Sequence, residues 1–149
     1  MSPHRIQIID SDPTAALVTQ RGLQRLLDND ADVTIAPSPE AAWVACTQSV
    51  VELLIIDPTP QSVAITAMIK AVREQYPALP ILILTAYDSP LLRRTMRMQG
   101  IIHYVAKPVT LHDLSELVRT IFGTLPPAPA PDGANAALLD DHIELSHNH

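Results

Sequence analysis

The sequence predicts an α/β protein built as a doubly wound, five-stranded parallel sheet between two layers of helices. Apolar runs of four to six residues alternate with longer helix-like stretches, which is the pattern of buried parallel strands joined by crossover helices. Capping residues and prolines mark where these stretches begin and end. Because the alternation continues to about residue 122, it leaves little room for another fold class.

The first strand is predicted over residues 6–9, and a helix follows it directly. Asp12 is placed to cap this helix, with Pro13 in the first turn, where the missing N–H costs nothing. The acidic segment 28–30 breaks the helix before a short second strand over 33–36.

The same alternation continues through the rest of the globular part. The remaining strands are predicted over 53–56, 81–84 and 101–106, and the remaining helices open near residues 38, 62, 89 and 110. Two of these helices pair a serine cap with a proline, and Thr110 with Asp113 resembles a capping box. Gly100 fits the turn after the fourth helix.

The composition is that of a single globular domain. The chain has 149 residues, 47% of them hydrophobic, which is enough for a sizeable core. Aromatic residues make up only 3% and the formal charge is −6, so we expect no direct nucleic-acid partner. No signal peptide or membrane-length apolar run is recognisable. The single cysteine, Cys46, excludes an intramolecular disulfide, predicts a packed helix residue and fits a cytoplasmic location.

The composition shifts after the last predicted helix, so we expect a domain over 1–123 and a separate segment over 124–149. Residues 125–131 are typical of a Pro/Ala-rich, extended linker. Beyond it the segment has no Lys or Arg, and its acidic residues are Asp132, Asp140, Asp141 and Glu144. Residues 136–145 fit a short amphipathic helix, with a solvated acidic tail as the alternative.

Four of the predicted strands end on polar residues that suit one site. Asp10, Asp57, Thr85 and Lys107 each follow an apolar run directly. Because ligands of a doubly wound sheet bind in the crevice at the carboxyl ends of the strands, we expect these side chains to converge. Two carboxylates, a hydroxyl and an ammonium suit a phosphoryl group together with a divalent metal.

The motifs at these strand ends carry a family resemblance. They are Leu-Leu-Ile-Ile-Asp57, Ile-Leu-Ile-Leu-Thr85-Ala86 and Tyr104-Val-Ala-Lys107-Pro108. In this order and spacing, the chain resembles the receiver domain of bacterial two-component response regulators, the CheY-like superfamily, over roughly residues 4–123. The resemblance implies a flavodoxin-like (βα)5 three-layer sandwich and a signalling role rather than an enzymatic one.

The resemblance assigns a role to each residue of the crevice. Asp57 matches the phosphate-accepting aspartate, whose carboxylate attacks the phosphoryl group of a histidine kinase. Lys107 matches the lysine that pairs with the phosphoryl oxygens. Thr85 matches the hydroxyl residue that moves to bond them, and the N–H of the small Ala86 is a further donor. Tyr104 matches the aromatic residue that changes rotamer once the threonine has moved.

The resemblance also implies a Mg²⁺ site made by Asp10, Asp57 and the backbone carbonyl of Thr59. Ser11 stands where the family usually has a second acid, which is a direct metal ligand. A hydroxyl is a poorer ligand there, and we expect it to weaken Mg²⁺ binding by about 1–3 kcal/mol. Asp12 is a potential substitute, but we favour its role as a helix cap.

The loop after Asp57 also departs from the family pattern. Proline stands three residues after the acceptor instead of four, and Pro58 and Pro60 remove two N–H donors. Thr59 keeps the N–H that the family directs at the phosphate. Tyr87, just beyond the fourth strand, is bulky enough to shield an acyl phosphate from water.

The partners implied are a sensor histidine kinase or phosphotransfer protein and a downstream protein or effector domain, with no membrane contact. In some receivers the surface of helix four, strand five and helix five forms a homodimer. The charged residues that would serve such a surface here are Arg93, Arg94, Arg97, Asp113, Glu116 and Arg119. A solvated charged face is the alternative, since exposed ion pairs contribute little.

Three functions follow from these residues. The leading one is a receiver that switches a protein–protein surface on phosphorylation. Ser11 and the altered loop motivate the second, a degenerate receiver with a weakened Mg²⁺ site that acts as a phosphorylation-independent interaction module. The third is a flavodoxin-like enzyme or cofactor carrier, which is disfavoured because no Gly-rich phosphate loop follows the first strand.

Overall fold

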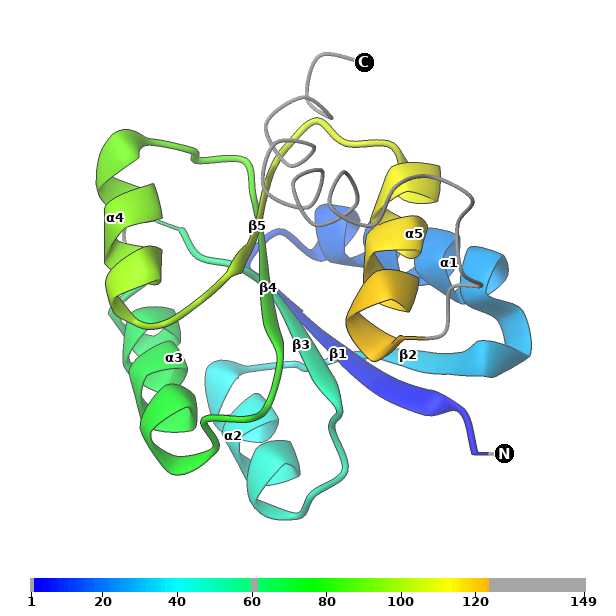
Figure 1. The fold of residues 1–149 in the computed structure, drawn as a ribbon, viewed down its shortest axis with the longest axis horizontal. Coiled ribbons are helices and arrows are strands. Elements are labelled where there is room, and N and C mark those ends of the chain that lie inside the picture. The colour runs from blue at the N-terminus through cyan, green and yellow to red at the C-terminus, as the bar shows by residue number, and fades with distance from the viewer. Residues whose placement is uncertain (1, 60–61, 124–149) are drawn as a thin grey trace.

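The computed structural model describes residues 2–59 and 62–123 (Figure 1). Its elements are β1 (His4–Asp10), α1 (Pro13–Leu27), the 3-10 helix η1 (Asp28–Asp30), β2 (Ala31–Ile35), α2 (Pro39–Thr47), β3 (Leu53–Asp57), α3 (Val63–Gln75), β4 (Ile81–Thr85), α4 (Pro90–Met98), β5 (His103–Ala106) and α5 (Leu111–Phe122). The predicted linker and acidic tail lie outside the described residues, as does Pro60.

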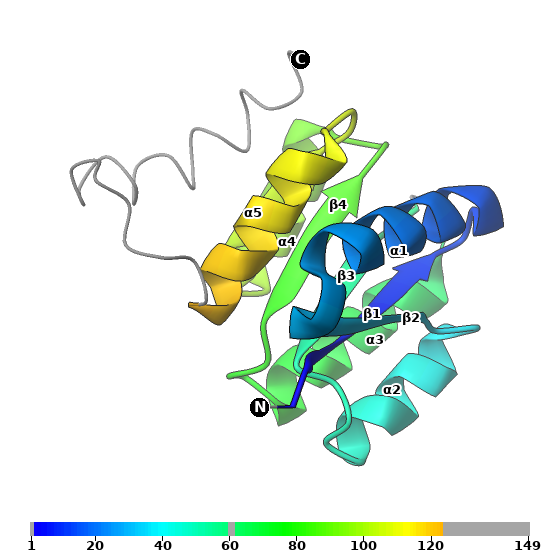
Figure 2. The same ribbon diagram turned by 90° about the vertical axis from the view of Figure 1, so that its right-hand side faces the viewer.

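The strands form one five-stranded parallel sheet in the order β2-β1-β3-β4-β5. Helices α1 and α5 cover one face of the sheet, and α2, α3 and α4 cover the other (Figures 1 and 2). The predicted doubly wound, three-layer architecture is therefore confirmed. Because the winding direction reverses between β1 and β3, the carboxyl ends of these two strands border the crevice of the fold.

The central strands are buried along their whole length. Every residue of β3 and of β4 is buried, including the polar residues Asp57 and Thr85 at their ends. Because helices cover both faces of a parallel sheet, its inner strands carry continuous apolar runs instead of an alternating pattern. The same runs that identify the strands in the sequence thus place two polar side chains at the rim of an apolar core.

Side-chain caps begin the helices where the sequence predicts them. The Oδ1 atom of Asp12 accepts hydrogen bonds from the N–H groups of Thr14 (3.0 Å) and Ala15 (3.3 Å) at the start of α1. The hydroxyl of Thr110 accepts from the N–H of Asp113 (3.0 Å) at the start of α5. Serine caps open the other three helices, at Ser38, Ser62 and Ser89.

The starts of three strands differ from the prediction by two residues. Strand β1 begins at His4 instead of residue 6. Strand β2 begins at Ala31, because this residue already pairs with His4 of β1. Strand β5 begins at His103 instead of residue 101. The amide of Ile101 donates to the carbonyl of Met96 at the end of α4 (3.0 Å), so Ile101 continues the helix turn although its side chain is buried.

Two features outside the crevice also follow the composition. Cys46 is buried in α2, and burial raises the pKa of its thiol to about 11, so it is a packing residue and not a nucleophile. Within residues 2–59 and 62–123, no helix has both the length and the hydropathy needed to cross a bilayer.

Helices α1 and α5 pack closely at Gly22. A Cβ atom added to Gly22 would lie 2.8 Å from Cδ2 of Leu111, which is closer than van der Waals contact. The absence of a side chain at Gly22 therefore lets the first turn of α5 lie against α1. Leu111 is the first residue of α5, directly after the β5–α5 connection that carries Lys107.

We expect Gly22→Val to lower the free energy of unfolding by about 1–3 kcal/mol, because the added side chain overlaps Leu111. Urea denaturation of the single variant and of the double variant Gly22→Val/Leu111→Ala measures this contact. The double variant should lose less free energy of unfolding than the sum of the losses in Gly22→Val and in Leu111→Ala, because Leu111→Ala removes the overlap. Full additivity would contradict the close approach of the two helices.

Candidate functional site

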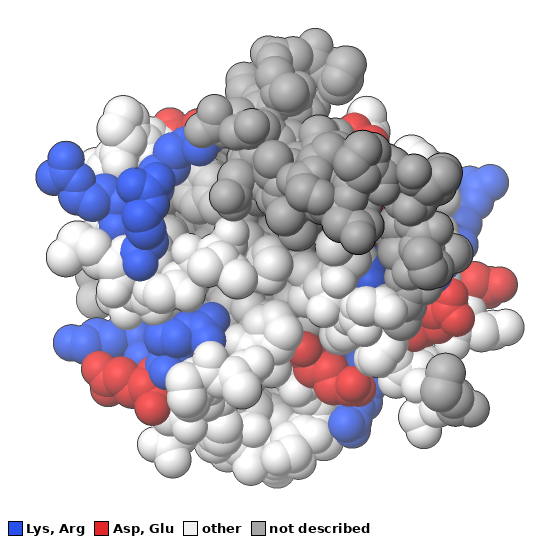
Figure 3. Space-filling view, in the orientation of Figure 1, with Lys and Arg blue, Asp and Glu red and all other residues white. Residues whose placement is uncertain are grey.

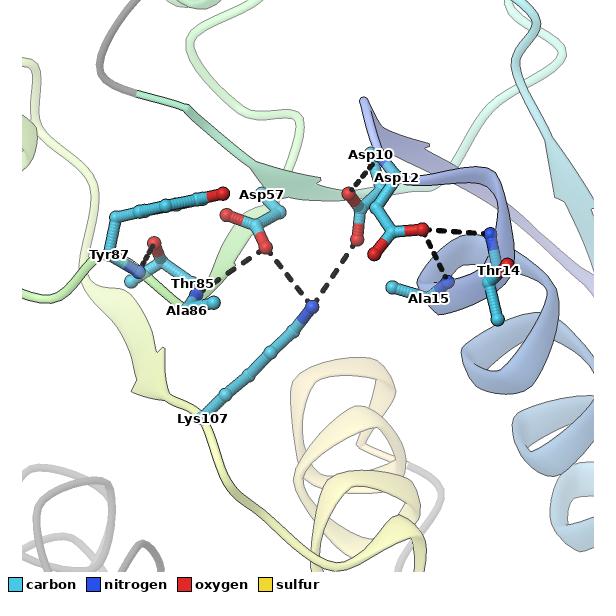
Figure 4. A network of polar contacts seen from close by, with 9 residues as sticks. All are labelled: Asp10, Asp12, Thr14, Ala15, Asp57, Thr85, Ala86, Tyr87 and Lys107. Atoms are coloured by element: carbon cyan, nitrogen blue, oxygen red, sulfur yellow. Dashed lines mark hydrogen bonds and ion pairs between the residues drawn. The ribbon is translucent and has the colours of Figure 1, made fainter.

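The register of the sheet brings the predicted site residues together. Asp10 and Asp57 are directly paired positions at the ends of β1 and β3. The backbone N–H of Lys107, just after β5, donates to the carbonyl of Thr85 at the end of β4 (2.8 Å). Figure 4 shows the side chains of Asp10, Asp57, Thr85 and Lys107 at this edge of the sheet. These polar strand-end residues therefore share one crevice.

The ammonium group of Lys107 lies between the two carboxylates. Its Nζ atom is 3.1 Å from Oδ2 of Asp57 and 3.3 Å from Oδ2 of Asp10. Both carboxylate side chains are only 6% exposed, and the lysine side chain is 22% exposed. A single positive charge is thus shared by two buried negative charges.

These contacts shift the pKa values in a definite direction. Burial raises the pKa of Asp57 above its ordinary 3.8, the bond and charge of Lys107 oppose that rise, and the charge of Asp10 adds to it. Burial alone would lower the pKa of Lys107, but the bond to Asp57 and the charges of both carboxylates outweigh burial and raise it. Lys107 therefore stays protonated, and the surroundings of Asp57 make its charged form less favourable than it is in water.

The two oxygens of Asp57 differ. Oδ2 accepts from Lys107 and also from the backbone N–H of Ala86 (3.4 Å). Oδ1 is buried and has no hydrogen-bond partner among the described residues. A buried carboxylate oxygen without a donor is costly, so such an atom points to a bound group or to a chemical role.

The carboxylate oxygens beside Oδ1 of Asp57 fit a Mg²⁺ site with few protein ligands. Asp10 and Asp57 supply carboxylate oxygens, and Mg²⁺ in proteins needs only one or two of these beside waters and phosphate oxygens. Ser11 is exposed, and the described residues contain no group of three or more acidic, His or Cys side chains able to hold a metal. The carbonyl of Thr59 accepts from the N–H of Ser62 (3.1 Å).

Asp12 does not supply the missing carboxylate. Its Oδ1 atom bonds the first turn of α1, and Figure 4 shows its side chain turned toward Thr14 and Ala15. Its own backbone N–H donates to Oδ1 of Asp10 (2.9 Å), which orients the carboxylate of Asp10. The capping role is therefore confirmed.

The hydroxyl of Thr85 lies beside the crevice and is completely buried. Its oxygen accepts from the backbone N–H of Tyr87 (2.9 Å), which tightens the start of the β4–α4 connection. The side chain of Tyr87 is half exposed, and in the view of Figure 4 its ring runs toward the Asp57 carboxylate. A shielding role for Tyr87 stays a prediction.

Tyr104 belongs to a second network that the sequence did not predict. Its hydroxyl donates to Oδ1 of Asp88 (2.7 Å), and its ring is buried. Arg93 donates from Nε and Nη2 to the two oxygens of Asp88 (2.8 and 3.0 Å) and stacks its guanidinium over the Tyr104 ring, 4.9 Å from the ring centre. Burial and the neighbouring Asp88 raise the pKa of Tyr104.

This network changes the interpretation of the charged helix residues. Arg93 pairs with Asp88 and lies over the Tyr104 ring, whereas the homodimer surface that would include it stays a prediction. Arg119 binds Asp30 (2.6 Å) of η1, on the side of α1. The sequence gives only a weak signal of the Asp88–Arg93 pair. Asp88 lies before the cap of α4 and five residues before Arg93, whereas side chains that pair on a helix are three or four residues apart.

We expect Lys107→Met to lower the free energy of unfolding by about 1–3 kcal/mol at pH 7, because two buried carboxylates lose their shared cation. Without the ammonium, the pKa of Asp57 rises further, so the folded variant gains stability as the pH falls and this carboxyl is protonated. The deficit should therefore shrink between pH 7 and pH values near the ordinary 3.8.

Urea denaturation at several pH values measures this effect. Lys70→Met is the matched control, because Lys70 is the other lysine of the chain and is exposed on α3. A deficit that is the same at both ends of the pH range, or one shared by the Lys70 variant, would contradict the shared-cation account.

Comparison with known proteins identifies the relatives of this fold and site. The response regulator receiver domain family matches residues 6–119. Sensor protein GacS of Pseudomonas syringae pv. syringae is 28% identical over 139 residues, which is 90% of this chain. The chain spans 15% of the length of that relative.

Solved structures show the same fold at low identity. A response regulator receiver protein from Pseudomonas putida has a TM-score of 0.70 at 20% identity, with 80% of this chain and 98% of that chain covered. A response regulator from Thermotoga maritima has a TM-score of 0.69 at 22% identity, with 83% and 99% covered. Because the family matches most of the chain and the sheet has the same architecture, this chain belongs to the response regulator receiver domain family of two-component signalling.

Proposed function

We propose that this chain accepts a phosphoryl group on Asp57 from a sensor histidine kinase or phosphotransfer protein and thereby switches a protein-interaction surface. Receiver domains as a family are signalling domains that interact with such partners. The observation that carries the proposal is the asymmetry of the Asp57 carboxylate. One oxygen is bonded to Lys107 and Ala86, and the other is buried without a partner in the described part of the chain.

The proposed reaction is a phosphoryl transfer between two nucleophiles. Oδ1 of Asp57 attacks the phosphorus of a phosphohistidine, an O–P bond forms, and the N–P bond breaks. The imidazole leaves with the electron pair of that bond and takes up a proton. The ammonium of Lys107 and the N–H of Ala86 are the charge-assisted and neutral donors placed to meet the transferred oxygens.

Receiver domains typically bind Mg²⁺ at their acidic pocket, and Asp10, Asp57 and the carbonyl of Thr59 are the proposed ligands here. When bound, Mg²⁺ supplies neutralisation of the carboxylate and phosphoryl charge. The protein itself contributes position: β1 and β3 hold the two carboxylates side by side, and the backbone N–H of Asp12 orients the carboxylate of Asp10.

The proposed switch passes through the end of β4. A phosphoryl group on Asp57 offers new acceptors to the hydroxyl of Thr85, which now accepts from the N–H of Tyr87. Tyr87 is followed by Asp88, which holds Tyr104 and Arg93. Movement of Thr85 therefore shifts the balance of a network that joins β5 to α4.

A degenerate receiver is the second candidate, favoured by the neutral Ser11 and by the absence of a third acidic ligand among residues 2–59 and 62–123. Such a protein would bind its partner through the same surface without phosphorylation. The two candidates differ in one respect: the first gains a phosphoryl group in the presence of Mg²⁺, and the second does not.

Intact-mass analysis after incubation with acetyl phosphate separates the candidates. We expect wild type to gain one phosphoryl group with Mg²⁺ and none with EDTA, because the charge around Asp57 otherwise opposes transfer. Asp57→Asn should gain none, because it lacks the nucleophilic oxygen. A folded wild-type protein that gains no mass in any condition would favour the degenerate module.

We expect Ser11→Asp to tighten Mg²⁺ binding by roughly tenfold to a hundredfold, the equivalent of about 1–3 kcal/mol, because it adds a carboxylate beside Asp10. Isothermal titration calorimetry with Mg²⁺ measures the affinity. Asp12→Ser is the control: serine also caps helices well, so this variant should bind Mg²⁺ about as tightly as wild type. A large loss in Asp12→Ser would instead show that Asp12 is a ligand.

A further inference from the structure

The outward face of α4 is both apolar and basic. Helix α4 has three arginines, no acidic residue and only one buried residue, Met96. Leu91 and Met98 are 72% and 81% exposed, and Ile102, just after the helix, is 74% exposed. In Figure 3 the Lys and Arg side chains gather over the region of α4.

Two of the arginines carry the charge of this face. Arg93 is bound to Asp88, as described above, whereas Arg94 and Arg97 are exposed. In the part of the chain that the structure describes, Arg94 and Arg97 make no ion pair within 4.0 Å. We call the set Leu91, Arg94, Arg97, Met98 and Ile102 the α4 face.

Such a face fits a segment that is acidic and apolar. Large exposed apolar side chains rimmed by charge mark protein interaction sites, and complementary charge selects the partner. The chain itself contains a segment of this chemistry. Residues 132–145 carry Asp132, Asp140, Asp141 and Glu144 without any Lys or Arg, interleaved with Leu138, Leu139, Ile143 and Leu145.

We propose that residues 132–145 of this chain dock on the α4 face, with their carboxylates against Arg94 and Arg97 and their leucines and isoleucine against Leu91, Met98 and Ile102. The α4 face is basic and residues 132–145 are acidic, so their charges are opposite. Both also carry apolar residues among charged residues of a single sign.

The topology lets the segment reach this face. Helices α4 and α5 both run from the carboxyl end of the sheet toward its amino end. Helix α4 connects the end of β4 to the start of the parallel strand β5, and α5 follows the end of β5. Phe122 therefore ends at the same end of the sheet as Met98 and Ile102. In extended polyproline form, residues 124–131 would span up to about 25 Å at roughly 3.1 Å per residue. Helices α5 and α4 lie on opposite faces of the sheet, so two layer spacings of about 10 Å each separate them, which this span still covers.

The tether makes even a weak contact effective. A segment attached to the same chain acts at an effective concentration that reaches the millimolar range, so docking does not require high intrinsic affinity. The docked segment would cover the apolar side chains of α4, which lie on the helix that Arg93 couples to Tyr104. This step rests on the proposed function: if phosphorylation of Asp57 makes the α4 face available to a partner, the docked segment competes with that partner for the α4 face.

Paramagnetic relaxation enhancement in the full chain tests the docking. A nitroxide is attached at Ser146→Cys in a Cys46→Ala background, where alanine keeps the buried position apolar. We expect the amide signals of α4 and of Ile102 to fall at least about twofold in intensity relative to the reduced label, whereas those of β2 and α2 stay unchanged. No loss at α4, or a loss centred on α1, would overturn the proposal.

A mixture of labelled unenriched chain and unlabelled ¹⁵N-enriched chain distinguishes docking within one chain from docking on a second copy. The intramolecular proposal predicts no signal loss in the mixture beyond that of a free label. A loss at α4 that appears in the mixture at the strength seen within one chain would assign the segment to a second copy and overturn the proposal.

Charge exchange then tests the chemistry of the contact. The α4 signals should regain their intensity in Arg94→Glu/Arg97→Glu and also in Asp140→Arg/Asp141→Arg/Glu144→Arg. When both sets of changes are combined, the charges are complementary again, so the label should again reduce the α4 signals. The matched control is Arg21→Glu/Arg25→Glu, which makes the same charge change on exposed positions of α1. Equal restoration by the control would show that only net charge matters and would overturn the proposal. The readout involves no phosphorylation, so it stands apart from the test of the proposed function.

Discussion

The structure depends on one shared cation, the Lys107 ammonium between Asp57 and Asp10. Two carboxylates that are 6% exposed repel each other and lose their hydration, so without a counter-charge one of them would take up a proton or the crevice would open. The sheet register fixes where this happens, because it pairs Asp10 with Asp57 and ties the backbone of Lys107 to Thr85. The same arrangement leaves Oδ1 of Asp57 buried and without a donor in the described part of the chain.

The charge cluster and the Tyr104 network meet in four consecutive residues. The N–H of Ala86 bonds Asp57, the hydroxyl of Thr85 bonds the N–H of Tyr87, and Asp88 holds Tyr104 and Arg93. Ala86, which contacts Asp57, is therefore only two residues along the chain from Asp88, whose contacts fasten α4 to β5. Helix α4 buries only Met96, fewer residues than any other helix that covers the sheet, so it is the helix least held by the core when this network shifts.

Much of the fold follows from local chemistry that one sequence displays. Apolar runs identify β3 and β4, and the caps at Asp12 and Thr110 place α1 and α5, because burial and capping are decided by neighbouring residues. The strand-end positions of Asp57 and Lys107 follow from the parallel topology. The Asp88–Arg93–Tyr104 network does not, because it depends on side-chain directions across α4, β5 and the connection between β4 and α4. Likewise, Arg119 pairs with Asp30 far along the chain, and Ile101 is apolar enough to resemble a strand although its amide closes the end of α4.

The shared-cation account is tested most directly by the pKa of Asp57 itself. Its side-chain ¹³C chemical shift, followed with pH in wild type and in Lys107→Met, reports protonation of this one carboxyl. The account predicts a midpoint above the ordinary 3.8 in wild type and a still higher one in the variant, because burial and Asp10 then act without the ammonium. A wild-type midpoint at or below 3.8, or one that the variant leaves unchanged, would contradict it.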